Sequence, residues 1–304
     1  MYKAINFHTN YFIKSMLKIG IIGAKNSHCA NIARICNVQK LVPARVVAVW
    51  GETKLLAQTV AKAAQIPTIA QDWRDMAGLV DGVIIDHRHA KFHVAPARFF
   101  LERGVPCFVD KPFTFTFREG KSLCALARRT KTPLTSFSVI PLEPSFQHFK
   151  KLCRKAGRLA NVNFSGPADL QDKDGGVFFY GIHQVDAMVE LLGGDVDLVR
   201  VLSHGNGGVA MITYKDGPIV TLNLLNNGFG EFHWSAVGET KVVSCLHNYD
   251  SARYLRGARL FTTMFRTGRE PFPHERFLAP IAILEAINKS WKLGKPVTVT
   301  SMAL

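Results

Sequence analysis

The sequence has no apolar run that approaches the length of a membrane-spanning helix, and its first 16 residues lack the continuous apolar core and cleavage site of a signal peptide. Its six cysteines are dispersed, without a C-x-x-C pair or the spacing of a disulfide framework, which is typical of reduced thiols. We therefore expect a cytoplasmic protein that binds no membrane. Residues 1–16 are interpreted as an N-terminal extension.

Acidic residues are scarce, with 23 Asp and Glu against 38 Lys and Arg, and the formal net charge is +15. Basic residues concentrate at 150–155 and again over 253–276. Such an excess suits a partner with negative charge, but no nucleic-acid-binding motif accompanies it and few aromatic residues lie between the basic ones. We therefore expect no nucleic-acid partner and interpret the charge as a solvated surface, while an acidic small molecule stays possible.

The first half of the chain alternates short strands rich in β-branched residues with amphipathic helices. This order predicts a Rossmann-type, doubly wound parallel sheet covered by helices on both faces, over residues 17–140. The predicted strands are 18–23, 45–50, 82–86, 105–110 and 134–139, and the predicted helices are 27–37, 53–65, 72–79, 90–103 and 117–130.

The second half, residues 141–304, predicts an α+β domain with a largely antiparallel open sheet. One helix is marked by apolar residues at helical spacing, and a further helix ends the chain. Because open sheets often pair with a second subunit, we expect a homodimer or tetramer. The predicted helices are 178–192 and 275–292, and the predicted strands are 197–203, 208–214, 219–225, 231–237 and 241–246.

The segment GIIGAKNSH, residues 20–28, begins like a dinucleotide-binding G-x-G-x-x-G turn and then departs from it. From Gly23 onward the second and third glycines are replaced by Lys25 and His28. Gly23 can still form the turn, Lys25 could add a cation near the phosphates, and Asn26 or Ser27 could cap the helix. We interpret the segment as a modified cofactor site made by Gly23, Ala24, Lys25, Asn26, Ser27 and His28.

Other ligand contacts are expected beyond the carboxyl ends of the following strands. After the second strand, Glu52 would favour NAD by binding the ribose hydroxyls, whereas Gly51 with Lys54 would admit the 2′-phosphate of NADP. The cofactor is therefore NAD or NADP, and the sequence leaves the choice open. After the third strand comes Asp86, which we include among the cofactor-binding candidates.

The segment 105–115, VPCFVDKPFTF, resembles the E-K-P segment of the glucose–fructose oxidoreductase and inositol dehydrogenase (Gfo/Idh/MocA) family, with Asp110 replacing glutamate. Residues 175–186, GGVFFYGIHQVD, resemble the family's G-G-x-x-x-D-x-G-x-H-x-x-D helix. The resemblance spans about residues 17 to 300. It implies NAD(P)-dependent hydride transfer at a hydroxyl or carbonyl carbon of a small, often sugar-like, substrate.

The resemblance also assigns roles. Lys111 would polarise the substrate oxygen, and His183 would accept or donate the proton. The family's acidic residue four positions before this histidine is Phe179 here, so Tyr180 becomes the candidate acid. Asp186 would orient the imidazole or contact the substrate. A protein that keeps the fold and binds a ligand without catalysis is the alternative.

A histidine-rich segment, Asp86 to His93, could instead suggest a metal, since His89 and His93 lie one helical turn apart. The Gfo/Idh/MocA family carries a helix histidine without metal at the position of His93. We therefore predict no metal site, and we interpret His87 and Arg88 as polar contacts to an acidic or hydroxylated ligand.

Overall fold

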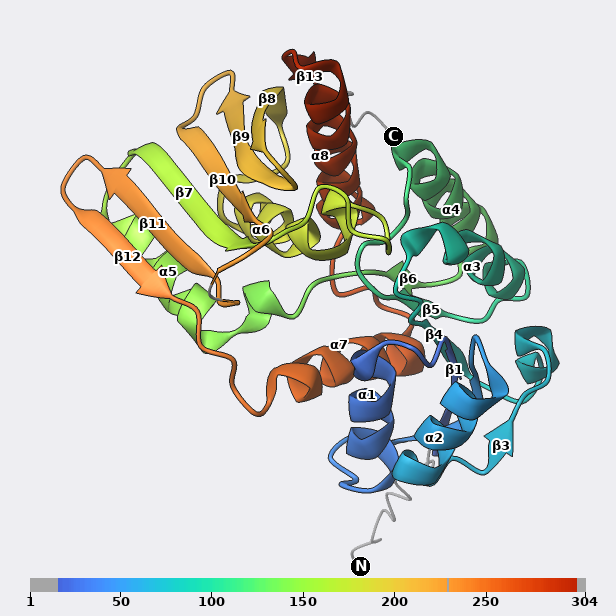
Figure 1. Cartoon of the computed structure of the whole chain (residues 1–304). Coiled ribbons are helices and arrows are strands. Elements are labelled where there is room, and N and C mark those ends of the chain that lie inside the picture. Colours follow the sequence, from blue (N-terminus) through green and yellow to red (C-terminus); the bar gives the residue numbers. More distant parts are fainter. Residues whose placement is uncertain (1–15, 229, 300–304) are drawn as a thin grey trace, which may run out of the picture.

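The computed structural model describes residues 16–228 and 230–299, which form two sheets with helices packed around them (Figure 1). The first is a parallel sheet with the strand order β3-β2-β1-β4-β5-β6, which is the Rossmann order. Its strands are β1 Leu17–Ile22, β2 Ala44–Trp50, β3 Thr68–Ile69, β4 Gly82–Ile85, β5 Cys107–Val109 and β6 Leu134–Thr135.

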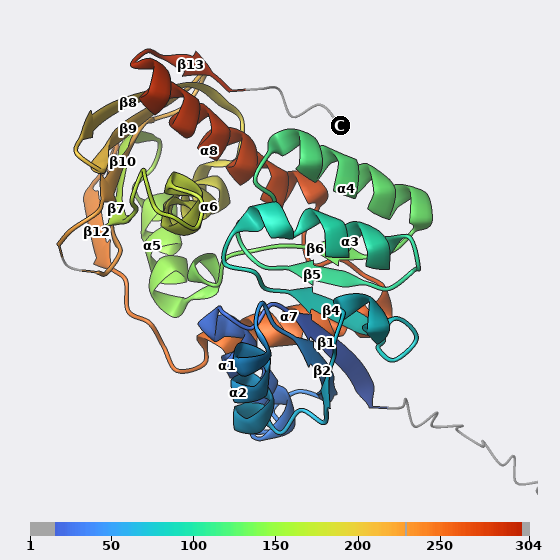
Figure 2. The same cartoon turned by 45° about the vertical axis from the view of Figure 1, so that its right-hand side comes forward.

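Helices cover both faces of this sheet, as its apolar strands require (Figure 2). Side chains of α1, α2 and α7 pack on one face, and those of α3 and α4 pack on the other. The bounds are α1 Ser27–Asn37, α2 Lys54–Ala64, α3 Val94–Leu101, α4 Phe117–Thr130 and α7 Arg253–Thr267, with the 3₁₀ turns η1 Trp73–Met76, η2 Ala90–Phe92 and η3 Ile140–Leu142.

Helix α7 comes late in the chain, yet it completes the core beneath the first sheet. The Phe261 ring stacks on Phe108 of β5 with centroids 4.8 Å apart. Gly82 at the start of β4 leaves room for Phe265, because a Cβ there would lie 2.6 Å from that ring. Sequence analysis did not predict this helix, since its arginines were interpreted as part of a basic surface.

The second sheet has the order β12-β11-β7-β10-β9-β8-β13 and is antiparallel except between β7 and β10. Three helices pack against it, so its opposite face is open (Figure 1). Its strands are β7 Leu159–Pro167, β8 Val196–His204, β9 Gly207–Tyr214, β10 Ile219–Leu225, β11 His233–Gly238, β12 Val242–Leu246 and β13 Val297–Thr298, and its helices are α5 Pro144–Lys155, α6 Val177–Leu192 and α8 His274–Leu293.

The predicted fold class is therefore confirmed, although α5 and β7 were not foreseen. Within the residues that the structure describes, no helix is both long and apolar enough to cross a membrane.

Candidate active site

The turn after β1 is shaped for a close approach of backbone to backbone. Gly23 has φ +108°, and a Cβ on it would lie 2.7 Å from the carbonyl carbon of Asp86. Only glycine fits there without strain. Gly51 at the end of β2 is similarly crowded, because a Cβ on it would lie 2.8 Å from that of Ala24. The first and second strands thus end in a tight cradle.

Glu52 closes this cradle from the β2 side. Its Oε2 accepts hydrogen bonds from the backbone N–H of Ala24 at 2.9 Å and of Lys25 at 3.1 Å. An acidic residue at this position is the group that binds the ribose hydroxyls in dinucleotide sites, so the cradle fits such a cofactor. Lys54, the other predicted contact here, is exposed at the start of α2.

Asn26 occupies the N-cap position of α1, but its side chain forms no cap hydrogen bond, so the predicted capping by Asn26 is wrong. Its Nδ2 instead donates to Asp86 Oδ1 at 2.8 Å and to Asp110 Oδ2 at 3.1 Å. The carboxyl oxygens at the strand ends accept from this amide, whereas the N–H groups of the helix terminus are themselves donors. Ser27 is the first residue of α1, and its carbonyl accepts a hydrogen bond from Asn31.

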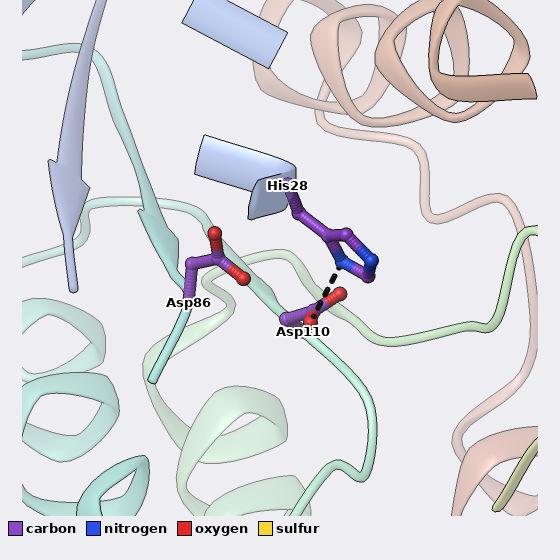
Figure 3. A group of neighbouring side chains, drawn as sticks. All are labelled: His28, Asp86 and Asp110. Carbon is purple, nitrogen blue, oxygen red and sulfur yellow. Dashed lines mark hydrogen bonds and ion pairs between the residues drawn. The ribbon is translucent and has the colours of Figure 1, made fainter. Parts of the chain in front are cut away.

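His28 turns toward the ends of β4 and β5 (Figure 3), where its Nδ1 lies 3.1 Å from Asp110 Oδ2. Ligand atoms of His28, Asp86 and Asp110 all lie within 4.8 Å of one another. Burial and the neighbouring charge of Asp110 raise the pKa of Asp86 well above its usual value. Burial also acts to raise the pKa of Asp110, but His28 and Lys111 hold it well below the usual range.

Lys111 follows Asp110 in the sequence and is nearly buried, with 7% of its surface exposed. Its Nζ lies 5.5 Å from the centre of the Phe179 ring on α6. No residue in 16–228 or 230–299 forms a hydrogen bond with this ammonium. A positive charge is therefore held between the end of β5 and α6, without a direct anionic partner among the described residues.

His183 lies on α6, close enough to Lys111 to be influenced by its charge. Burial and then the charge of Lys111 lower its pKa well below the usual value, so its imidazole is neutral. Its Nδ1 lies 2.7 Å from Ser138 Oγ. Its Nε2 has no hydrogen-bond partner in the described part of the chain, which leaves that atom available to a ligand.

Asp186, three residues further along α6, is fully engaged by the protein. Its Oδ2 accepts a hydrogen bond from Ser138 N at 3.1 Å, and its Oδ1 pairs with Arg276. The carboxylate thus positions the segment that carries Ser138, which in turn contacts His183. Its contact with the imidazole is indirect.

Phe179 packs between cations where the family has an acid. The Arg88 guanidinium lies 4.5 Å from the centre of its ring. Arg88 also forms an ion pair with Asp174 Oδ2 at 2.9 Å, and Asp174 Oδ1 lies 3.5 Å from Lys25 Nζ. Tyr180 is 43% exposed, and its ring centre lies 5.9 Å from that of His183.

The other histidines of the segment are held by protein contacts. In His93, Nε2 lies 2.9 Å from the carbonyl oxygen of His87, and Nδ1 lies 3.1 Å from that of Pro112. His89 Nδ1 accepts a hydrogen bond from Lys91 N. His87 is buried against Trp50 and Phe92, and burial lowers its pKa to about 3.

The sequence-based list omitted residues that the structure brings to the cleft. Asp110 was noted only as a replacement in the E-K-P segment, and Asp174 stands directly before the double glycine of the second motif. Because both residues stand in or beside a recognised motif, the sequence offered a signal for each of them. Ser138 and Arg276 lie outside any motif, and only the packing of η3 and α8 against α6 reveals them.

Comparison with known proteins identifies the first domain. Residues 17–137 match the profile of the Gfo/Idh/MocA oxidoreductases, an oxidoreductase family with an NAD-binding Rossmann fold. Residues 17–137 therefore carry the Rossmann fold of the Gfo/Idh/MocA family. The predicted family, its Rossmann fold and a nicotinamide dinucleotide as its cofactor are thereby confirmed.

A UDP-N-acetylglucosamine 3-dehydrogenase from Acidithiobacillus ferrooxidans is 27% identical over 142 residues, which cover 45% of this chain and 42% of that protein. Two solved structures share the whole fold. Myo-inositol 2-dehydrogenase from Lactobacillus plantarum has a TM-score of 0.80 at 16% identity, covering 93% of this chain and 99% of its own. Scyllo-inositol dehydrogenase from Lactobacillus casei, with bound NAD(H) and scyllo-inositol, has a TM-score of 0.80 at 16% identity. The match covers 94% of this chain and 100% of that one.

Proposed function

We propose that the protein is an NAD-dependent dehydrogenase that transfers a hydride between nicotinamide and a hydroxyl or carbonyl carbon of a small polar, sugar-like substrate. The observation that supports this most strongly is the proximity of a neutral imidazole, His183, to the Lys111 ammonium, which has no hydrogen-bond partner among the described residues. The charge of Lys111 is a cause of the lowered pKa of His183, so the two side chains lie in one electrostatic environment. The cofactor accepts or supplies the hydride when bound.

Lys111 stabilises the negative charge that develops on the substrate oxygen as its proton leaves. Because the ammonium is nearly buried and has no described hydrogen-bond partner, this interaction is stronger than it would be in water. His183 exchanges the proton at Nε2. These are the roles that the family resemblance assigned to both residues.

Ser138 can partner His183 in either direction of the reaction. When Nδ1 donates its proton to Ser138 Oγ, Nε2 is unprotonated and accepts a proton from a hydroxyl. When the Ser138 hydroxyl donates to Nδ1, Nε2 carries the proton and donates it to a carbonyl oxygen. The contact at 2.7 Å is compatible with both, so one site supports oxidation and reduction.

Glu52 gives a reason for NAD rather than NADP. Its carboxylate is fixed on the turn by Ala24 and Lys25, where it would repel a 2′-phosphate. We expect NADH to bind at least about tenfold more tightly than NADPH, and Glu52→Gln to narrow that ratio. Fluorescence titration with both cofactors measures it, with the exposed Glu102→Gln as control. Equal affinities in the unaltered protein would contradict this preference.

Phe179 supports the alternative, a ligand-binding protein without catalysis, because it removes the acid next to His183. A screen of polyols, sugars and hydroxy acids with NAD⁺, followed by NADH absorbance, separates the two. Turnover that Lys111→Ala abolishes while the fold persists supports the dehydrogenase. Binding of NADH without turnover of any substrate supports the alternative.

Arg88 and His87 remain the proposed contacts to the substrate beside the cofactor, and Tyr180 on α6 remains the candidate acid. Arg88 is the group suited to a carboxylate or phosphate, although a ligand would share it with Asp174. Arg88→Gln should therefore weaken the binding of a substrate with an acidic group. It should weaken the binding of a neutral polyol less.

We propose a homo-oligomer that pairs through the open face of the second sheet. Leu202 and Val209 lie opposite each other on β8 and β9, and Val237 and Val242 do so on β11 and β12. All four are exposed. Exposed apolar side chains at both ends of one sheet face are typical of a subunit contact. Light scattering after size exclusion tests the assembly, and a monomer would contradict it.

A further inference from the structure

Two carboxyl groups stand side by side where the first sheet ends. Strands β4 and β5 are parallel neighbours, with Ile85 opposite Val109, so the next residues, Asp86 and Asp110, leave the sheet together. Figure 3 shows Asp110 below the ring of His28 and Asp86 to the side of it. Asp86 is 0% exposed and Asp110 is 4% exposed. Two buried negative charges in this position would repel each other strongly.

The surrounding hydrogen bonds favour one carboxylate over the other. Asp110 Oδ2 accepts from Asn26 and faces the ring nitrogen of His28, whereas Asp86 Oδ1 receives only the amide of Asn26. Asp86 Oδ2 has no partner, and Asp86 has no ion pair, among residues 16–228 and 230–299. Asp110 is therefore the ionised member, and Asp86 is the member that retains a proton.

A bound cation would be the other way to neutralise the pair, but the neighbours oppose it. The amide N–H₂ of Asn26 is a donor and points at both carboxyl groups. The ammonium of Lys111 acts on both carboxyl groups as a nearby positive charge. A metal ion here would have to approach that ammonium, and only three ligand atoms are grouped, so a shared proton fits better than a metal.

We propose that Asp86 and Asp110 share a single proton, held on Asp86, and that the oxidised cofactor displaces it on binding. This rests on the proposed function. The cofactor lies in the crevice beyond the strand ends, and the ring of NAD⁺ is positive whereas that of NADH is neutral. A positive ring near the pair favours two ionised carboxylates, which NADH does not.

The other titratable groups around the pair also influence its proton. From α1 come His28 and Cys29, from the end of β5 comes Lys111, and from the adjoining helices come His93 and His183. Cys29 is buried and its pKa is raised above its usual range, so it stays a neutral thiol at the pH of the test. The displaced proton is therefore assigned to Asp86.

Isothermal titration calorimetry with NAD⁺ and NADH, each in two buffers of different ionisation enthalpy, measures the protons released on binding. We expect up to one proton per NAD⁺ and none per NADH. The affinity for NAD⁺ should then increase with pH, by up to about tenfold per pH unit, while that for NADH stays constant. Equal proton release by the two cofactors would overturn the proposal.

The matched variant is Asp86→Asn, which keeps the acceptor oxygen for Asn26 and supplies N–H donors in place of the acid proton. It should bind both cofactors without releasing a proton. Asp216→Asn, an exposed residue in the turn between β9 and β10, should behave like the unaltered protein. Proton release that persists in Asp86→Asn would also contradict the proposal.

Infrared spectroscopy of the protein without cofactor separates this inference from the proposed function. The carbonyl band of a protonated carboxylic acid should be present at neutral pH and absent in Asp86→Asn. If neither cofactor bound, the dehydrogenase and the displacement of the proton would both fail, yet this band would still show whether the pair holds a proton. A missing band, or a stoichiometric metal ion in the purified protein, would overturn the shared proton.

Discussion

Single side chains after β5 and on α6 define the chemistry that this site can perform. Lys111 places a positive charge beside a neutral His183, and Phe179 stands where the family has an acid. Because phenylalanine exchanges no proton, any proton transfer from substrate depends on His183 and its partner Ser138. This site therefore has one proton-exchanging group fewer than a relative that keeps the acid.

Replacing Lys111 by methionine tests its charge directly. Methionine keeps an apolar stem in the buried site but removes the ammonium, so we expect kcat to decrease by about 10²- to 10³-fold, with NADH affinity nearly unchanged. Steady-state rates with a substrate found by screening measure this. Lys215→Met, an exposed turn residue, is the control. Unchanged kcat in Lys111→Met would contradict the assigned role.

His247 should make stability depend on pH. Its burial and then the charge of Arg253 lower its pKa from 6.5 to about 4. The folded state thus disfavours the protonated form, so stability is complete above pH 6.5 and decreases as pH falls from 6.5 to about 4. In His247→Gln this decrease should be smaller, as measured by urea unfolding at pH 7 and pH 5.

His204, which is exposed at the end of β8, provides the matched substitution. His204→Gln should leave the pH dependence as it is in the unaltered protein. If His247→Gln lost as much stability between the two pH values as the unaltered protein, the buried imidazole would not be the cause.

The sequence predicted the site residues that belong to recognisable motifs. It did not predict the contacts that arise only from packing. Lys111 and His183 stand in recognisable segments, and both face the cleft. The contact of His28 with Asp110 joins residues 82 positions apart and depends on where α1 begins relative to β5. The sequence alone contains no such distance, so His28 was interpreted as part of the modified cofactor turn, and its contact with Asp110 was not predicted.

At the scale of elements, α7 is the segment that most depends on the rest of the fold. Its apolar side lies on the first sheet, and its fit depends on Gly82 of β4, where an added Cβ would lie 2.6 Å from Phe265. We expect Gly82→Ala to lower the free energy of unfolding by about 1–3 kcal/mol, because the ring must move.

Gly230→Ala is the control, since a Cβ there would meet nothing within 4 Å. Denaturant unfolding of both variants measures the difference. Equal stabilities would mean that α7 can shift at little cost and is not closely fitted to the sheet.

The elements that the sequence predicted well are those whose pattern has one physical cause. Buried parallel strands such as β4, with all four residues buried, give short apolar runs that have no other explanation. Helix α7 has an apolar side, but four arginines lie in it and a fifth just after it. Because this segment was interpreted as a basic surface, the helical spacing of its apolar residues was not recognised. Strand β3 has two exposed residues, which no pattern distinguishes from a loop.

At the scale of the whole molecule, a shared carboxylate connects the segment before α6 with the loops of the first sheet. Asp174, which precedes α6, pairs with Arg88 and Lys25 of the Rossmann domain. Both cations are partly exposed, so these pairs contribute little to stability on their own. Their position matters more, because the three residues lie between the cofactor turn and the helix that presents His183.

The most direct measurement of the central claim is a titration of the purified protein with NADH, following energy transfer from its four tryptophans to the nicotinamide. We predict saturable binding that is weaker for NADPH and is lost in Gly23→Val, whose side chain would fill the space against Asp86. No binding up to millimolar concentration, or binding that Gly23→Val leaves unchanged, would contradict a dehydrogenase that uses this cleft.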